Sequence, residues 1–214
     1  MLNKRLRWIA VGVFVLSSSL NFLDRSLLAA LAPAVEREFH MNDQGYGFLV
    51  AAFSLAYALS SPVTGYLLDR FGLDRVAQIL VGWWSAVSVL TGLTRNFSGL
   101  VACRIGLGIG ESGGIPAVAK MGGLYLPEEE RALGSALGQV GITLGSIAAP
   151  SLGVWMAVRY GWRSPFLVTG CLGLLWLPLW ALVSKRIRPE FGDTPATVPV
   201  NLDRRLAILV AANV

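Results

Sequence analysis

Residues 65–72 read Gly-Tyr-Leu-Leu-Asp-Arg-Phe-Gly, and this short stretch lies between two long apolar runs. Its charged residues are Asp69 and Arg70, and Gly72 suits a tight turn because glycine lacks a side chain that would restrict its backbone. The runs on either side, 43–68 and 75–94, are each long enough to cross about 30 Å of hydrocarbon as an α-helix. The stretch therefore predicts two antiparallel membrane helices joined by a tight turn.

The same alternation continues along the chain and predicts six membrane-spanning helices. They cover residues 8–39, 43–68, 75–94, 97–125, 130–158 and 164–183. Hydrophobic residues make up 54% of the chain and charged residues 14%, whereas soluble domains carry about 25% charged residues. We therefore expect an all-α membrane protein in which residues 1–184 form a six-helix transmembrane bundle.

The two ends of the chain need separate interpretation. The first apolar run follows Lys4, Arg5 and Arg7, as a secretory signal peptide would, but it is too long for one and contains Asp24 and Arg25. We therefore expect it to remain as the first helix. Residues 185–205 contain three prolines and alternating charges, which predicts a cytoplasmic linker. Residues 206–214 are apolar again and predict the start of a truncated seventh helix.

Lysine and arginine residues are unequally distributed between the two sides of the predicted bundle. If the amino terminus is cytoplasmic, eleven of the 18 fall on the cytoplasmic side, four on the opposite side and three inside helices. This bias follows the positive-inside rule for a chain with an even number of spans. It predicts a multi-pass protein of the cell inner (plasma) membrane. It also accounts for the net charge of +5 without a nucleic-acid partner.

Five charged residues lie away from the ends of the predicted helices, where an uncompensated charge costs roughly 2.5–3.5 kcal/mol. They are Asp24, Arg25, Arg104, Glu111 and Lys120. Arg104 and Glu111 are seven residues apart, so one helix face would carry both, about 10 Å apart along the axis. Charges kept in a membrane indicate pairing, a water-filled pathway, or both. The alternative is that these charges only lock the helices together.

The remaining motifs do not indicate an enzyme. Gly106, Gly108 and Gly110 are spaced as in a dinucleotide-binding loop, but the segment is expected to be a membrane helix with no strand before it. Small residues there instead let neighbouring helices approach closely. Cys103 and Cys171 lie in apolar helices without a disulfide or metal-ligand spacing. We expect no enzymatic activity, no metal site and no cofactor.

The stretch 65–72 resembles the loop signature G-x-x-x-D-R-x-G of the major facilitator superfamily. The resemblance implies a cytoplasmic gate formed by Gly65, Asp69, Arg70 and Gly72. Asp69 would end a helix, where the helix dipole disfavours an anion, so we expect a cation such as Arg131 beside it. The superfamily fold has twelve helices. This chain would be its amino-terminal half, with a carboxy-terminal six-helix half as partner.

Within the superfamily, five stretches resemble anion:cation symporters, especially carriers of hexuronates and aldonates. They are residues 21–25, 52–57, 104–120, 127–132 and 161–166. The resemblance implies that Arg25 binds a substrate carboxylate and that Tyr57, Lys120 and Gln139 line the site. Lys120 would reach the site only if its helix turns at Pro116, because an ideal helix points it away from Glu111.

The same resemblance implies a set of residues for proton coupling. Asp24 and Glu111 would be the proton-responsive acids, and Arg104 would tune Glu111. Phe22 and Ser54 differ from the residues common in the family, which leaves contacts to sugar hydroxyls open.

The expected function is therefore secondary active transport, with proton-coupled uptake of a small organic anion such as a hexuronate or aldonate. Two alternatives stay open. Residues 145–153 carry a partial antiporter-like run of small residues and Pro150, which would suit an anion exchanger or an efflux antiporter. The chain could also be a fragment that does not transport without a second half.

Overall fold

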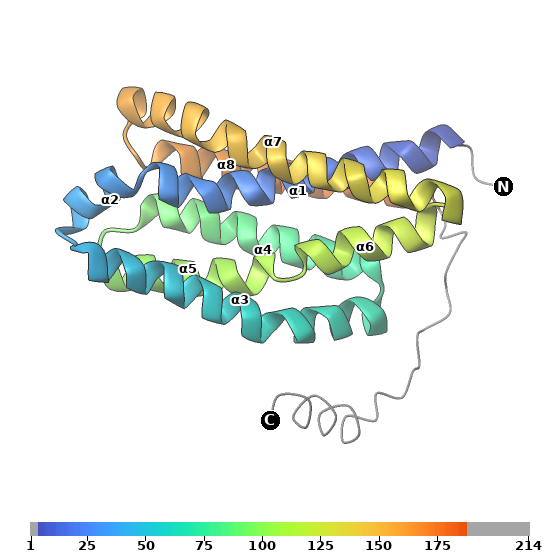
Figure 1. Cartoon of the computed structure of the whole chain (residues 1–214), viewed down its shortest axis with the longest axis horizontal. Coiled ribbons are helices and arrows are strands. Elements are labelled where there is room, and N and C mark those ends of the chain that lie inside the picture. The colour runs from blue at the N-terminus through green and yellow to red at the C-terminus, as the bar shows by residue number, and fades with distance from the viewer. Residues whose placement is uncertain (1–3, 188–214) are drawn as a thin grey trace, which may run out of the picture.

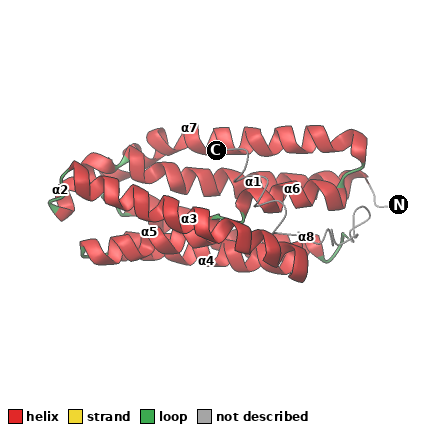
Figure 2. Cartoon of the chain, turned by 60° about the horizontal axis from the view of Figure 1, so that its bottom comes forward, coloured by secondary structure: helices red, strands yellow, loops and turns green. Residues whose placement is uncertain are grey.

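The computed structural model describes residues 4–187, and every regular element in that range is an α-helix (Figures 1 and 2). The helices are α1 Lys4–Ala30, α2 Ala32–Phe39, α3 Asp43–Phe71, α4 Leu73–Leu93, α5 Phe97–Glu111, α6 Gly114–Tyr125, α7 Glu128–Tyr160 and α8 Ser164–Ser184. The long helices run side by side along the long axis of the molecule in both views.

Five of these helices are long and apolar enough to cross a membrane, namely α1, α3, α4, α7 and α8, with 27, 29, 21, 33 and 21 residues. Helices α5 and α6 have 15 and 12 residues and follow one another in roughly the same direction (Figure 1). Together they form one further crossing. The predicted all-α bundle of six transmembrane segments is therefore confirmed.

Two of the predicted helices are interrupted, which corrects the expected boundaries. The expected helix 8–39 breaks at Leu31, and Pro33 then lies in the first turn of α2, where its missing N–H is tolerated. The expected helix 97–125 breaks at Ser112 and Gly113. Pro116 explains the second break because a proline ring clashes with the carbonyl four residues earlier, here that of Ser112.

Short connections keep the helices antiparallel. Gly72 joins α3 to α4 and Gly161 joins α7 to α8, with φ angles of 83° and 86° that only glycine adopts without strain. Two helices begin at an asparagine cap. The side-chain oxygen of Asn42 accepts from the N–H of Gly45 at 3.0 Å, and that of Asn96 accepts from the N–H of Gly99 at 2.7 Å.

Helix α1 lies at the centre of the packing and runs along α7 and α8. The buried residues of α7 are all small: Gly134, Gly138, Gly141, Gly145, Ala149 and Gly153. A Cβ atom at Gly145 would overlap the backbone carbonyl of Ser19 on α1. The backbones of α1 and α7 therefore touch, as small residues permit in membrane helix pairs.

The core has two apolar clusters with polar residues between them along α1. One cluster takes in the part of α1 around Phe14 together with Trp176 and Trp180 of α8. The other takes in Leu27 and Leu28 of α1 together with Phe166. Asp24 lies in the stretch of α1 between the two clusters and is itself buried. Asp24 thus lies at the middle of the bundle.

The predicted linker 185–205 and the predicted start of a seventh helix, 206–214, lie outside the described residues, apart from 185–187.

Candidate functional site

Helix α1 carries two adjacent charged residues into the middle of the bundle. Asp24 is 2% exposed, and its Oδ1 accepts hydrogen bonds from Ser88 Oγ of α4 at 2.6 Å and from Thr169 Oγ1 of α8 at 2.9 Å. No described residue is a hydrogen-bond partner of its second oxygen, Oδ2. Asp24 thus links three helices through one of its two oxygens.

Arg25 points to the other side of α1, toward α3 and α5. Its Nε donates to Oε2 of Glu111 at 3.1 Å; the Glu111 side chain is fully buried and that of Arg25 is 28% exposed. The rings of Phe22, Phe53 and Tyr57 surround the guanidinium, with centroids 4.7, 5.1 and 4.7 Å from its carbon. Cation–π attraction holds the guanidinium in this aromatic cage. No described residue accepts a hydrogen bond from its Nη2.

Arg104 of α5 is the second buried guanidinium. It is 2% exposed, packs over the ring of Phe166 at 5.8 Å, and is close enough to Asp24 and Glu111 to act on both electrostatically. Within residues 4–187, its Nε and Nη2 and the Oε1 of Glu111 have no hydrogen-bond partner. The structure therefore gathers Asp24, Arg25, Arg104 and Glu111 into one group of two anions and two cations, which we call the charge cluster.

The charge cluster combines burial of three of its four side chains, those of Asp24, Arg104 and Glu111, with incomplete hydrogen bonding. Its four charges balance, which reduces the cost of placing them in the membrane. Polar atoms without partners at such depth are rare in folded proteins and are concentrated where a ligand, an ion or water completes the site. The arrangement suits a site that exchanges partners, with Arg25 as the member that is partly open.

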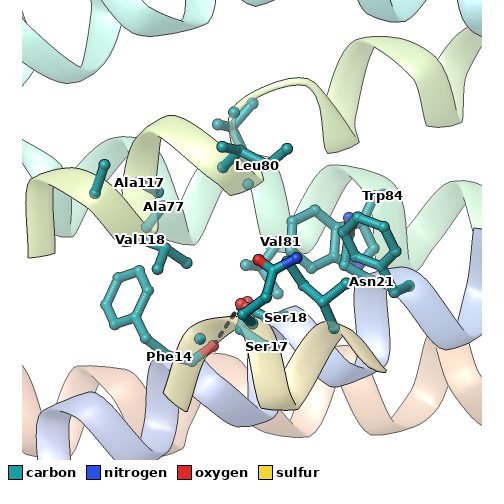
Figure 3. A pocket seen from close by; sticks show the side chains of 18 of the residues that line it. Phe14, Ser17, Ser18, Asn21, Ala77, Leu80, Val81, Trp84, Ala117 and Val118 are labelled. Carbon is teal, nitrogen blue, oxygen red and sulfur yellow. Dashed lines mark hydrogen bonds between the residues drawn. The ribbon is translucent and has the colours of Figure 1, made fainter. Parts of the chain in front are cut away.

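A cavity of about 320 Å³ lies beside the charge cluster, between α1, α4, α6 and α7 (Figure 3). In Figure 3, Ser17, Ser18 and Asn21 of α1 face Leu80 and Val81 of α4 across it. None of its lining side chains is charged. The polar ones are Ser17, Ser18, Asn21, Ser135 and Gln139.

Asn21 is the most informative lining residue. It is 3% exposed, and no described residue is a hydrogen-bond partner of its Nδ2. Phe22, the next residue, lines the cavity and also contacts the guanidinium of Arg25. The cavity and the charge cluster are therefore neighbours that share one aromatic wall.

The expected substrate-site residues are only partly brought together. Tyr57 contacts Arg25 directly, and Gln139 lines the cavity from α7. Lys120 does neither. Its Nζ donates to the carbonyl of Leu68 at 2.6 Å and to Oδ1 of Asp69 at 2.8 Å. Leu68 is eleven residues beyond Tyr57, about 16 Å along α3, so Lys120 is far from the charge cluster.

The partner of Asp69 also differs from the expectation. Asp69 pairs with Lys120, whereas Arg131 donates to the carbonyls of Leu126 at 3.2 Å and Gly123 at 3.3 Å. The physical reason is the break before α6, because it changes the direction in which Lys120 points. Lys120 then reaches the carboxyl end of α3, where a cation complements the helix dipole.

The rest of the expected gate lies at the same end of α3. Arg70 is exposed, and its Nη1 donates to Tyr66 Oη at 3.1 Å. Gly72 makes the turn to α4, and Gly65 lies on α3 with open space around it.

Sequence reasoning did not single out Ser88, Thr169, Asn21 and Phe53 as site residues. Serine and threonine in helices usually bond to the carbonyl of the preceding turn, as Thr91 does to Val87 at 2.9 Å. Only the packing of α4 and α8 against α1 turns Ser88 and Thr169 toward Asp24. Asn21 could have been recognised from the sequence, because a side-chain amide in an apolar helix needs hydrogen-bond partners.

Comparison with known proteins identifies the family. The model of the Major Facilitator Superfamily matches residues 14–210. A galacturonate transporter of Dickeya chrysanthemi is 33% identical over 187 residues, which cover 87% of this chain and 54% of that protein. A hexuronate transporter of Escherichia coli (strain K12) is 32% identical over 187 residues, covering 87% of this chain and 43% of that protein. The chain thus spans about half the length of these curated relatives and corresponds to their amino-terminal half.

Solved structures agree on the fold. A bacterial homolog of the human lysosomal transporter Spinster, in an inward-facing and unoccupied conformation, superposes with a TM-score of 0.81 at 23% identity, covering 97% of this chain and 50% of the other. The expected resemblance to sugar-acid carriers is confirmed by the curated relatives. The chain is an integral membrane protein that belongs to the major facilitator superfamily.

Proposed function

We propose that this chain is the amino-terminal half of a secondary transporter that takes up a small organic anion, such as a hexuronate or aldonate, together with protons. The observation that carries the proposal is Arg25. Its side chain is 28% exposed, its guanidinium is held by three aromatic rings, and its buried Nη2 has no hydrogen-bond acceptor among the described residues. The relatives named as galacturonate and hexuronate transporters support the choice of anion.

Arg25 has the right chemistry for a carboxylate. A guanidinium is permanently charged and presents several N–H groups in a plane, so it binds a carboxylate in a fixed orientation. Glu111 occupies the Nε edge, which leaves the Nη2 group for the substrate. The aromatic cage keeps water away from one face of the guanidinium and strengthens the attraction to an anion. Tyr57 belongs to this cage.

The neighbouring cavity suits the uncharged part of a sugar acid. Such a body carries hydroxyl groups on one side and C–H groups on the other, and the cavity mixes five polar uncharged side chains with apolar ones. Asn21 and Gln139 offer amide groups, which both donate to and accept from hydroxyls. Phe22 would then contact the bound molecule between its carboxylate and its hydroxyl-bearing end.

The charge cluster offers the groups for coupling to protons. Asp24 and Glu111 are the acids, and Arg104 acts on both. Removal from water favours the neutral form of a carboxyl group, and a nearby guanidinium favours the charged form. A substrate anion that binds Arg25 would weaken its pairing with Glu111, so substrate and proton binding would be linked.

A second six-helix half is part of this proposal. Carriers of this kind place their pathway between two halves. Helix α3 supports this, because it leaves Leu55, Leu59, Val63 and Tyr66 between 56% and 68% exposed. We propose that the pair Lys120–Asp69, with Gly65, Arg70 and Gly72, acts at the cytoplasmic gate between the halves.

We propose that the amino terminus is cytoplasmic. The support is the excess of lysine and arginine on that side, which the positive-inside rule links to the cytoplasm. Reporters fused after Leu73 and Glu128 are expected to lie in the cytoplasm, and those after Asn42, Asn96 and Gly161 outside it. The measurement is the accessibility of each reporter to a reagent that does not cross the membrane. Reversed signals at two or more positions contradict the orientation.

Transport itself is tested by reconstitution. We expect residues 1–214 alone to insert into liposomes without taking up labelled galacturonate. Added carboxy-terminal half, taken from the galacturonate transporter of Dickeya chrysanthemi, is expected to restore uptake that is driven by an inward proton gradient. Uptake by the chain alone would show that it needs no second half. Uptake that requires an internal anion and ignores the proton gradient would identify an exchanger instead.

A further inference from the structure

The carboxylate of Asp24 is held by hydroxyl groups from two other helices. Ser88 of α4 and Thr169 of α8 both reach its Oδ1, at 2.6 and 2.9 Å, and lie 3.3 Å from each other. All three residues are buried. This cluster ties α1 to α4 and α8 through a single oxygen atom.

Both hydroxyls have a second acceptor within reach. The carbonyl oxygen of Phe166 is 3.1 Å from Ser88 Oγ and 3.3 Å from Thr169 Oγ1. A hydroxyl carries one hydrogen, so at a given moment each donates to only one acceptor, which is Asp24, Phe166 or the other hydroxyl. A charged carboxylate is the stronger acceptor, because charge-assisted hydrogen bonds are roughly twice as strong as neutral ones. The choice between these acceptors therefore depends on the charge of Asp24.

The two oxygens of Asp24 are not equivalent. Oδ1 receives both hydroxyls, whereas no described residue is a hydrogen-bond partner of Oδ2. A proton that arrives at the carboxylate would therefore bind at Oδ2, the buried oxygen that accepts no hydrogen bond from a described residue. Once the group is neutral, Oδ1 is an ordinary carbonyl oxygen and holds the hydroxyls no better than Phe166 does.

We propose that Ser88 and Thr169 are positioning residues for proton coupling. They hold α1 to α4 and α8 while Asp24 is charged, and they turn to the carbonyl of Phe166 when Asp24 takes up a proton at Oδ2. The proton remains on Asp24, and the hydroxyl hydrogens only change acceptors. The inference rests on the proposed function for its purpose in transport, but the exchange of hydrogen bonds is a property of the chain itself.

Other charged groups near Asp24 also affect its affinity for protons. Arg104 and Glu111 of α5 act on it electrostatically, and Arg25 is its neighbour on α1. The stretch of α7 that packs here, 145–153, contains no ionisable residue, and neither does the stretch 84–92 of α4. On α8 the nearest ionisable residue is Cys171, whose side chain is exposed. In these stretches of α4 and α8, the groups that influence whether Asp24 is protonated are therefore the hydroxyls of Ser88 and Thr169.

The test is infrared spectroscopy of the full chain in lipid bilayers, with ¹³C-labelled aspartate and stepwise acidification. A protonated-carboxyl band that Asp24→Asn removes belongs to Asp24. Ser88→Ala and Thr169→Val are each expected to increase the proton affinity of Asp24 about tenfold, because each removes a hydrogen bond to the charged form. Both are also expected to shift the carboxylate bands of the charged form and to leave the frequency of the protonated band unchanged.

Two control variants distinguish the loss of a hydrogen bond to Asp24 from a general change in helix packing. Thr91→Val removes a buried hydroxyl one turn further along α4 that bonds to the carbonyl of Val87 and to Cys103 instead of Asp24, and it is expected to change neither band nor affinity. Thr169→Ser keeps the hydroxyl and is expected to behave like the unaltered chain. If Ser88→Ala does not fold, Thr169→Val still tests the proposal.

Three results would overturn the proposal. The first is an unchanged proton affinity in both Ser88→Ala and Thr169→Val. The second is a shifted protonated band in Ser88→Ala, which would mean that the hydroxyl stays on Asp24 after protonation. The third is the lack of any band that depends on Asp24. None of these results bears on anion binding at Arg25, so the proposed substrate site stands or fails separately.

Discussion

Arg25→Ala is expected to abolish binding of the organic anion. The guanidinium supplies both the charge and the directed N–H groups for a carboxylate, and the aromatic cage around it has no other cation. The loss of two charge-assisted hydrogen bonds, at about 1.5–3 kcal/mol each, corresponds to at least a hundredfold weaker affinity. The measurement is counterflow of labelled galacturonate in proteoliposomes that contain the chain and a complementary half.

Two variants make this result specific. Arg25→Lys is expected to restore little binding, because an ammonium group cannot reproduce the planar arrangement of N–H groups. Arg159→Ala is the matched control. Arg159 also packs on an aromatic ring, that of Trp155 at 5.0 Å, but at the end of α7. Counterflow in Arg25→Ala at the level of Arg159→Ala would exclude Arg25 from the substrate site.

Glu111→Gln is expected to eliminate proton-driven accumulation while leaving counterflow partly intact. Glutamine has nearly the shape of a protonated glutamate, so the variant mimics a carrier that cannot release its proton. Glu111 is fully buried and paired with Arg25, so its burial and the other members of the charge cluster together determine its charge. We expect the concentration ratio across the membrane to fall to about one when uptake is driven by a pH gradient. Asp24→Asn is expected to behave in the same way.

The control for this experiment is Glu38→Gln. Glu38 also pairs with an arginine, Arg163, at 2.9 Å, but its side chain is 44% exposed. Accumulation is expected to survive there, because the pair is partly exposed, far less buried than Glu111, and contributes little. If Glu111→Gln concentrates the anion as well as the unaltered carrier does, Glu111 does not carry the coupled proton.

Much of the fold could be predicted because the bilayer allows few solutions. Apolar length, turn glycines and the distribution of lysine and arginine led to six spans; five of them are single long apolar helices in the structure, and the broken pair α5–α6 takes the place of the sixth. The break at Ser112 was also accessible in principle, because it lies four residues before Pro116. The expectation of an unbroken helix over 97–125 was wrong because Pro116 interrupts the helix instead of only bending it.

The candidate site was harder because its contacts join distant segments. The charges of Asp24, Arg25, Arg104 and Glu111 are conspicuous in apolar helices, so their gathering could be expected. The hydrogen-bond partners of the other site residues could not be predicted. Lys120 and Asp69 are 51 residues apart, and their pairing depends on how α6 leaves the break. Ser88 resembles any other helical serine in sequence, and only tertiary packing selects its acceptor.

The contact between Gly145 and Ser19 affects how large sets of variants should be interpreted. Any side chain at Gly145 would displace the backbone of α1, which carries Asp24 and Arg25 only a few residues further on. A survey that scored growth on a sugar acid would therefore rank Gly145 with the substrate-binding residues. The underlying defect would be a shortage of correctly folded protein in the membrane. Scoring abundance and growth in parallel would assign Gly145 to assembly and Arg25 to recognition.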